Sequence, residues 1–214
     1  MLKIAHRGHS EKSRENTLHA FETAKESGFD MIEMDIQLDK NDEIVIYHDV
    51  HMNFEMVDTM TFLEMKRKCP ELLRLSDLFE QFDYTSIRID LDMKGSYRLA
   101  FFLCELLVKM KINMTNIWLA SFNIMHLELV QSINPEYKLG YMTSNTLSNE
   151  QSDYIVNKCN LRFLCYHWGC LYEENIQRLH EQGVMVFYYT LSNPKILYYT
   201  SRFDLDGIVS DIRI

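Results

Sequence analysis

The stretch MIEMDIQL, residues 31–38, alternates apolar and polar side chains, and this alternation decides between the fold classes open to the chain. Successive residues of a β-strand point to opposite sides, so one side is apolar and the other carries Glu33, Asp35 and Gln37. Buried carboxylates are costly unless they pair, bind a metal ion or lie at an open mouth. We therefore expect a sheet whose apolar side is covered by helices and whose other side lines a polar interior.

The stretch SIRIDLDMK, residues 86–94, repeats this pattern. Its polar side carries Arg88, Asp90, Asp92 and Lys94. One interpretation is a set of buried salt bridges, in which the two cations neutralise the two carboxylates. The other is a functional site, which is favoured because the charges lie toward the C-terminal ends of their strands, the end that carries the active sites of parallel barrels.

Strand patterns and helix patterns alternate along the chain, as they do in parallel β/α units. We expect strands at 2–6, 31–38, 43–49, 86–94, 116–121, 137–142, 161–167, 184–191 and 206–211, with helices between them. Treating 31–38 and 43–49 as one hairpin-like region predicts an α/β protein with a compact (β/α)8 TIM barrel, a single domain over 1–214 and only a short insertion after the second strand region. An open doubly wound sheet is the alternative, but no glycine-rich loop follows the first strand.

The composition limits the classes of function. The chain has 214 residues, of which 47% are hydrophobic and 25% charged, and its formal net charge is −9. This charge argues against a nucleic-acid partner and against attachment to an anionic membrane. Since no run could span a bilayer and the N-terminus has no apolar signal region, we expect a cytoplasmic protein without stable membrane insertion. The five cysteines form no CxxC pair and are expected to be free thiols.

Two histidines end strand patterns beside the acidic strands. His6 closes the strand at 2–6, and His48 closes the strand at 43–49, where we expect it to share a face with Ile44 and Ile46. A single histidine in such a place is more often a buried core residue. A pair of them beside carboxylates can instead serve as general base and general acid near neutral pH.

The remaining charged residues indicate the kind of ligand. Glu33, Asp35 and Asp92 offer hard oxygen ligands, which suit Mg²⁺ or Ca²⁺ better than Zn²⁺. Arg7 and Lys94 remain to hold an anion. Three carboxylates, one divalent cation and these two side chains sum to a charge of +1, which a phosphodiester of charge −1 would neutralise.

These residues resemble the glycerophosphodiester phosphodiesterase family, within the phosphatidylinositol-specific phospholipase C-like phosphodiesterase superfamily. The resemblance rests on an ordered set of motifs over nearly the whole chain: HRG (6–8), ENT (15–17), IEMD (32–35), HD (48–49), DMK (92–94), SF (121–122) and DGIVSD (206–211). Each motif is weak alone, and the ordered set is specific. It implies a (β/α)8 barrel that hydrolyses phosphodiesters with one divalent cation, Mg²⁺ or Ca²⁺.

The resemblance implies a role for each matching position. These are an acid–base pair of His6 and His48, phosphate ligands Arg7 and Lys94, metal ligands Glu33, Asp35 and Asp92, and supporting residues Glu15, Asn16 and Tyr189. The family usually has Glu-x-Lys where this chain has DMK at 92–94, so one metal carboxylate is a methylene shorter. The family's Trp-Thr-Val-Asn is replaced by YTLS at 189–192, where Tyr189 keeps an aromatic wall and Ser192 lacks the amide. The stretch between His48 and the helix at 75 is shorter than in many relatives, so we expect an open site whose headgroup preference cannot be inherited.

We therefore expect metal-dependent hydrolysis of small glycerophosphodiesters to an alcohol and sn-glycerol 3-phosphate. A phospholipase D-like activity on lysophospholipids would need exposed apolar loops, for which Met52, Phe54 and Met56 are the candidates near 50–60. A non-catalytic binder of glycerophospho ligands is disfavoured by the presence of both histidines. Trp168 forms either a substrate wall or the edge of the core. Four points stay open: the acid and base assignment, the attacking group (water or a substrate hydroxyl), the headgroup and the oligomeric state.

Overall fold

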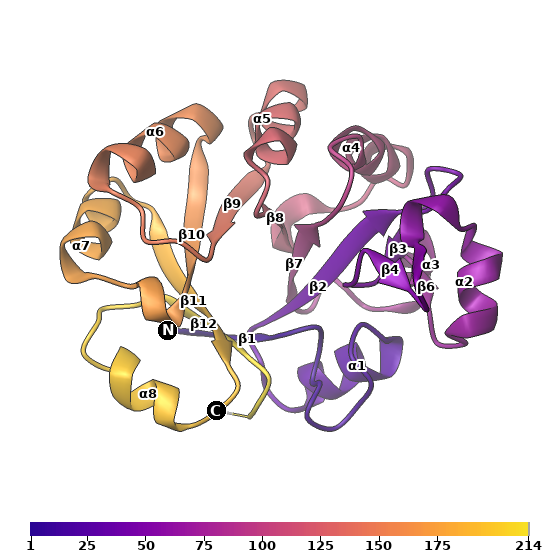
Figure 1. Ribbon diagram of the computed structural model, residues 1–214, viewed down its shortest axis with the longest axis horizontal. Coiled ribbons are helices and arrows are strands. Elements are labelled where there is room, and N and C mark those ends of the chain that lie inside the picture. The colour runs from indigo at the N-terminus through magenta and orange to yellow at the C-terminus, as the bar shows by residue number, and fades with distance from the viewer. Residues whose placement is uncertain (214) are drawn as a thin grey trace.

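The computed structural model describes residues 1–213 as a closed parallel barrel surrounded by helices (Figure 1). The barrel strands are β1 (Leu2–Ala5), β2 (Met31–Leu38), β7 (Arg88–Met93), β8 (Ile117–Ser121), β9 (Lys138–Thr143), β10 (Leu161–His167), β11 (Met185–Leu191) and β12 (Gly207–Ser210). They pair in parallel in this order, and the sheet closes because β1 pairs with both β2 and β12. The predicted (β/α)8 TIM barrel is confirmed.

Helices cover the outside of the barrel. They are α1 (Leu18–Glu26), α2 (Phe62–Lys68), α3 (Leu75–Gln81), α4 (Leu99–Lys109), α5 (Ile124–Ile133), α6 (Asn149–Cys159), α7 (Glu173–Glu181) and α8 (Lys195–Thr200), with 3-10 turns η1 (Val57–Thr59), η2 (Met114–Asn116) and η3 (Trp168–Cys170). Several begin at caps that the sequence supplies; the Thr17 hydroxyl, for example, accepts a hydrogen bond from the Ala20 amide at 3.2 Å. Within residues 1–213, none of the helices has the length and apolar character needed to cross a membrane.

Two short strands extend the sheet beside β2, namely β3 (Ile44–Ile46) and β6 (Leu73–Arg74), both antiparallel to their neighbours. The predicted strand over 43–49 is therefore too long. The Gln37 side-chain amide donates hydrogen bonds to the carbonyls of Tyr47 (2.7 Å) and Asp49 (2.9 Å). Because a side chain binds these carbonyls, the chain leaves the sheet after Ile46 and is free to turn over the barrel mouth.

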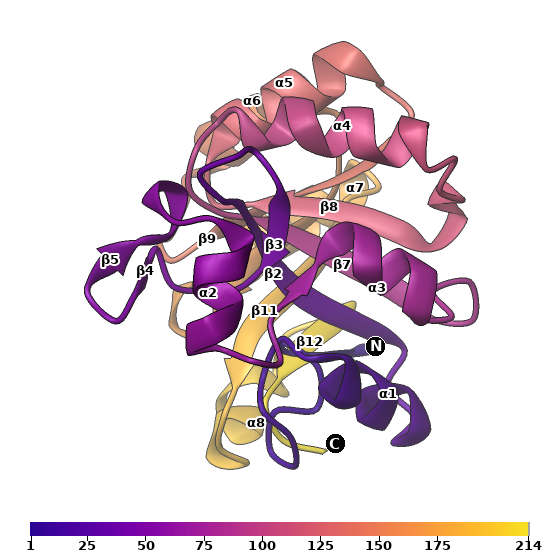
Figure 2. The ribbon, with the colours of Figure 1, turned by 90° about the vertical axis from the view of Figure 1, so that its right-hand side faces the viewer.

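The insertion that follows is short, as predicted, and contains a hairpin of β4 (His51–Met52) and β5 (Glu55–Met56). Figure 2 shows this hairpin projecting to one side of the barrel. Phe54 at its tip is fully exposed and Met56 is exposed, but Met52 is buried in a small core with Val57. Met52 is thus not part of an exposed apolar loop.

The core has an outer and an inner layer. The outer layer packs the apolar side of the strands, such as Met34 and Leu91, against the helices. The inner layer fills the barrel and consists of Ile4, Met31, Trp118, Ala120, Met142, Phe163, Cys165, Phe187 and Val209. A Cβ added to Gly140 would lie 2.0 Å from the Phe163 ring, so this large ring occupies space that only glycine leaves open. The barrel is therefore a packed core, and a ligand must bind at its end.

Candidate active site

A small pocket of about 120 Å³ lies at the end of the barrel where the strands finish. It is lined by His6, Arg7, Glu33, Asp35, His48, Asp92, Lys94, Phe122, Met142, Tyr189, Thr190 and Val209. These residues come from, or directly follow, β1, β2, β3, β7, β8, β9, β11 and β12. Both histidines, both cations and all three carboxylates singled out in the sequence thus meet in one place. Phe122 joins them, although the SF motif gave it no role.

The three carboxylates are held together by strand register. Parallel pairing sets Asp35 of β2 beside Asp92 of β7, and Glu33 beside Asp90. One oxygen from each of Glu33, Asp35 and Asp92 lies within 4.8 Å of the others, and all three side chains are buried. The inward orientation predicted from the alternating pattern is therefore confirmed.

Burial and charge affect these carboxylates differently. Burial, with the nearby charge of Asp35, raises the pKa of Glu33 well above its ordinary value. Burial also raises the pKa of Asp92, although Lys94 opposes the rise. Burial acts in the same direction on Asp35, but the charges of Lys94 and Arg7 outweigh it and lower its pKa. The cluster therefore repels further negative charge from itself and favours a bound cation.

The donor set fits a hard divalent cation. The Oδ1 atom of Asp92 is buried and has no hydrogen-bond partner among residues 1–213. An unpartnered carboxylate oxygen inside a protein is costly, and a metal ion would satisfy it. The shorter aspartate at position 92 still brings its oxygen within reach of Glu33 and Asp35, so the departure from the family's glutamate does not separate the three ligands.

Two cations lie against this cluster. Nε of Arg7 is 3.1 Å from Asp35, and its Nη1 is 3.0 Å from Glu15. Nζ of Lys94 contacts Asp92 and is 3.2 Å from Asp35. Both side chains are thus anchored by carboxylates at the pocket, where they can attract an anion.

The loop after β1 is built to hold Arg7 in place. Arg7 has a φ of 55° and Gly8 a φ of 82°, so the chain turns sharply here. The Arg7 amide donates to Glu33 at 2.8 Å. The Asn16 side chain donates to Asp35 at 2.9 Å and accepts from the Asp35 amide at 3.2 Å. Asn16 therefore braces a carboxylate and the loop together, a supporting position that the resemblance implied.

Each histidine has a carboxylate partner that the sequence did not single out. Nδ1 of His6 donates to Asp211 at 2.6 Å, and Nδ1 of His48 donates to Asp49 at 2.7 Å. These hydrogen bonds place a proton on Nδ1 and leave Nε2 to meet a ligand. The signal was present in the motifs HD and DGIVSD, whose aspartates had received no role. His48 itself lies beyond the end of β3, so strand alternation does not explain its position: Ile44 and Ile46 belong to the outer core, while His48 lines the pocket.

The salt-bridge interpretation holds only in part. Lys94 does pair with Asp92, but Arg88 is exposed while Asp90 is buried. Oδ1 of Asp90 has no hydrogen-bond partner in the described part of the chain. Burial and the nearby charge of Asp92 raise the pKa of Asp90 well above its ordinary value. Asp90 is therefore a buried acid below the pocket, separated from the cation expected to neutralise it.

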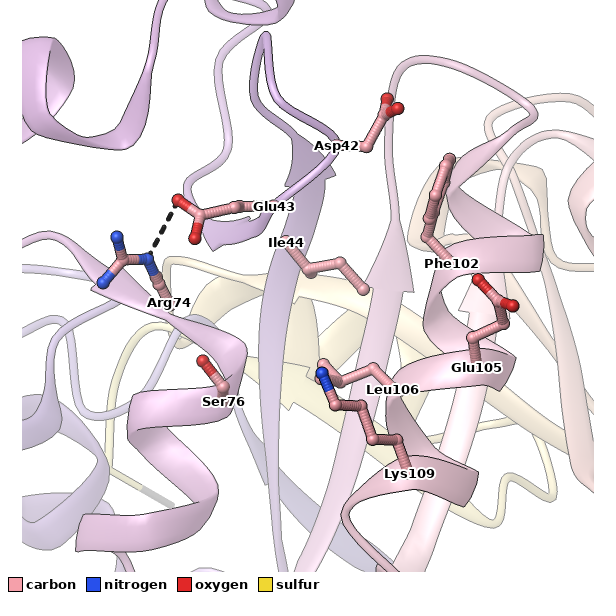
Figure 3. Close-up of a pocket in the computed structure, with 9 residues that line it drawn as sticks. All are labelled: Asp42, Glu43, Ile44, Arg74, Ser76, Phe102, Glu105, Leu106 and Lys109. Carbon is pink, nitrogen blue, oxygen red and sulfur yellow. Dashed lines mark hydrogen bonds and ion pairs between the residues drawn. The ribbon is translucent and has the colours of Figure 1, made fainter.

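Another hollow, of about 340 Å³, lies on the side of the barrel between β3, α3 and α4 (Figure 3). Three of its charged residues already have partners: Nε of Arg74 is 3.1 Å from Glu43, and Nη2 of Arg98 is 2.7 Å from Asp42. The residues that line it include no histidine. It lacks the acid–base groups of the barrel end, which we therefore take as the candidate active site.

Sequence comparison now gives an independent view. The model of the glycerophosphoryl diester phosphodiesterase family matches residues 6–88. A glycerophosphodiester phosphodiesterase from Caldanaerobacter subterraneus subsp. tengcongensis is 27% identical over 229 residues, covering 98% of this chain and 93% of that protein. The matched region contains the loop after β1, the Glu33 and Asp35 carboxylates and His48.

Solved structures agree along the whole chain. The crystal structure of a glycerophosphodiester phosphodiesterase from Thermotoga maritima superposes with a TM-score of 0.83 at 26% identity, covering 99% of this chain and 94% of that one. An Oleispira antarctica phosphodiesterase, solved with the product sn-glycerol-3-phosphate, shares the fold with a TM-score of 0.88 at 21% identity, covering 100% of this chain and 94% of that one. The fold is a TIM barrel, and the relatives named glycerophosphodiester phosphodiesterase support a phosphodiesterase. The match over residues 6–88, these relatives and the solved structures all support the glycerophosphoryl diester phosphodiesterase family for this chain.

Proposed function

We propose that this protein hydrolyses glycerophosphodiesters to an alcohol and sn-glycerol 3-phosphate with the help of one divalent cation. One observation carries the proposal: two histidines, each oriented by a carboxylate, face a pocket that also holds two cations and three clustered carboxylates. Names and structures of relatives support it, since the Oleispira antarctica protein was solved with sn-glycerol-3-phosphate.

The substrate phosphate would be held by charge. Arg7 and Lys94 are anchored by carboxylates and can present N–H donors to the phosphate oxygens. Glu33, Asp35 and Asp92 would hold the cation, Mg²⁺ or Ca²⁺, which when bound supplies positive charge to offset the charge that develops on the phosphate. Glu15 and Asn16 keep Arg7 and Asp35 in position.

The two histidines would move the protons. One removes the proton of the attacking hydroxyl, and the other protonates the departing alkoxide. The carboxylates of Asp49 and Asp211 stabilise each imidazole when it becomes charged and fix which nitrogen faces the substrate. Tyr189 contributes one wall of the pocket.

Release of sn-glycerol 3-phosphate from glycerophosphoglycerol, followed by a coupled assay with and without chelator, tests the proposal. We expect chelator-sensitive release that falls by at least about 100-fold in His6→Ala and in His48→Ala, because each removes a proton-transfer group. His51→Ala is the matched control, since His51 is exposed on the hairpin three positions after His48, and its activity should match the wild type.

Two results would count against the proposal. Failure to release product in Mg²⁺, Ca²⁺ or Mn²⁺ from any glycerophosphodiester would exclude simple hydrolysis and direct the search to lysophospholipids. Binding of sn-glycerol 3-phosphate without turnover would instead identify a non-catalytic binder.

A further inference from the structure

A row of aromatic rings leads out of the pocket, and we call it the aromatic row. Its members are Phe122, Tyr189, His167, Trp168 and Tyr199. The centroid distances between successive rings are 5.6, 5.8, 5.3 and 6.2 Å. The row begins where Nζ of Lys94 lies 4.9 Å from the centre of the Phe122 ring, so its inner end touches the proposed phosphate site.

The row is most exposed at its outer end. Tyr189 lines the pocket, and Trp168 on η3 is half-buried. Tyr199 on α8 is 58% exposed and stacks on Trp168 with an angle of 26° between the ring planes. A substrate whose phosphate sits in this small pocket must extend its remaining groups outward, and the aromatic row forms a surface along one such path.

The charge at the mouth indicates which headgroup suits that path. Beyond the three clustered carboxylates, the mouth carries Glu15, Asp49 and Asp211, whose side chains are 48%, 65% and 35% exposed. The chain as a whole has a net charge of −9. An anionic headgroup would be repelled here, and a cationic one would be attracted.

We propose that Trp168 and Tyr199 form the outer part of a leaving-group subsite that selects a quaternary ammonium alcohol. The inference rests on the proposed function and names the substrate class that the site would prefer. A quaternary ammonium has no N–H to donate, so it binds through charge and contact with ring faces, which the aromatic row supplies. A primary ammonium keeps its hydration shell and gains less from the same rings.

An apolar chain could occupy the aromatic row instead of a quaternary ammonium group. A neutral isostere of choline, which has the same shape without the positive charge, distinguishes these two occupants. We would measure kcat/KM for glycerophosphocholine and for glycerophospho-3,3-dimethylbutanol, in which carbon replaces the ammonium nitrogen. The wild type is expected to prefer the choline ester. That preference should fall about fivefold in Trp168→Leu and in Tyr199→Leu, since each removes one cation–π face.

Trp168→Phe is the rescue variant, because it keeps an aromatic face and should keep most of the preference. Phe101→Leu is the matched control: Phe101 is exposed on α4, away from the pocket, and the substitution should leave the preference as it is in the wild type. Unchanged thermal midpoints would show that the variants fold.

Equal kcat/KM for the two esters in the wild type would overturn the inference, as would a preference that Trp168→Leu and Tyr199→Leu leave intact. Equal losses for both esters would assign the aromatic row to apolar groups instead. These outcomes are distinct from failure of the proposed function, in which neither ester, nor glycerophosphoglycerol, would release sn-glycerol 3-phosphate.

Discussion

At the scale of single residues, strand alternation was enough to find Glu33, Asp35 and Asp92, because a carboxylate on the side opposite to the apolar face must point into the barrel. It was not enough to find Asp49 and Asp211 as histidine partners. Asp211 reaches His6 only because the last strand pairs with the first, and that pairing is a property of the closed sheet. A contact that depends on closure of the barrel cannot be predicted from a local sequence pattern.

A buried histidine outside the pocket yields a pH prediction. His126 on α5 is fully buried, and its Nε2 lies 2.9 Å from the Ser96 carbonyl oxygen. Burial lowers its pKa, so below the ordinary histidine value the unfolded chain takes up a proton that the folded chain does not. The free energy of unfolding should therefore fall as the pH drops from about 7 through the ordinary histidine pKa of about 6.5.

Urea unfolding at several pH values, in chelator, measures this effect. His126→Gln should be less stable at neutral pH, since it loses the fitted ring, but its stability should depend less on pH between about 7 and 5. His51→Gln, at an exposed position, should keep the wild-type pH dependence. An equal slope in His126→Gln and the wild type would mean that other groups cause the acid loss.

At the scale of elements, the sequence predicted the barrel strands well and the region after β2 poorly. In β2 and β7, apolar and polar side chains alternate with a period of two residues, which makes these strands easy to recognise in the sequence. The stretch after β3 keeps strand-like composition, but a side chain, Gln37, binds its carbonyls and removes it from the sheet. Competition by a side chain for backbone hydrogen bonds cannot be read from periodicity.

The close packing of Gly140 in β9 against Phe163 leads to a prediction about stability. Gly140→Ala would place a methyl group 2.0 Å from the Phe163 ring, inside a filled barrel, and should destabilise the protein by about 3 kcal/mol. Urea unfolding would measure the loss. Combining it with Phe163→Leu should cost less than the sum of the two single changes, because the smaller side chain leaves room. Strictly additive losses would show that the two positions do not compete for space.

At the scale of the whole molecule, the alternation of strand and helix patterns predicted the closed barrel, and the position of the charges toward the C-terminal ends of β2 and β7 predicted which end would be polar. The carboxylate cluster joins these two neighbouring strands. A cation bound there would favour the folded barrel over the unfolded chain, in which Asp92 is no longer held beside Glu33 and Asp35.

The thermal midpoint should therefore rise when Mg²⁺ or Ca²⁺ is added to chelator-treated protein. At about 100 times the dissociation constant the gain is about 2.7 kcal/mol, or roughly 5–10 °C for a chain of this size. Asp92→Asn should abolish most of the shift, and Asp58→Asn, on an exposed turn, should keep it. A shift of equal size in Asp92→Asn would place the bound ion elsewhere.

The hydrogen bond between His6 and Asp211 has a consequence for fragments of this chain. The two residues are 205 positions apart, and the pairing of β1 with β12 brings them together. A fragment cut before β12 would keep His6 but lose both the strand beside β1 and the carboxylate that contacts Nδ1. A single cut there would therefore open the barrel and leave His6 without its orienting partner.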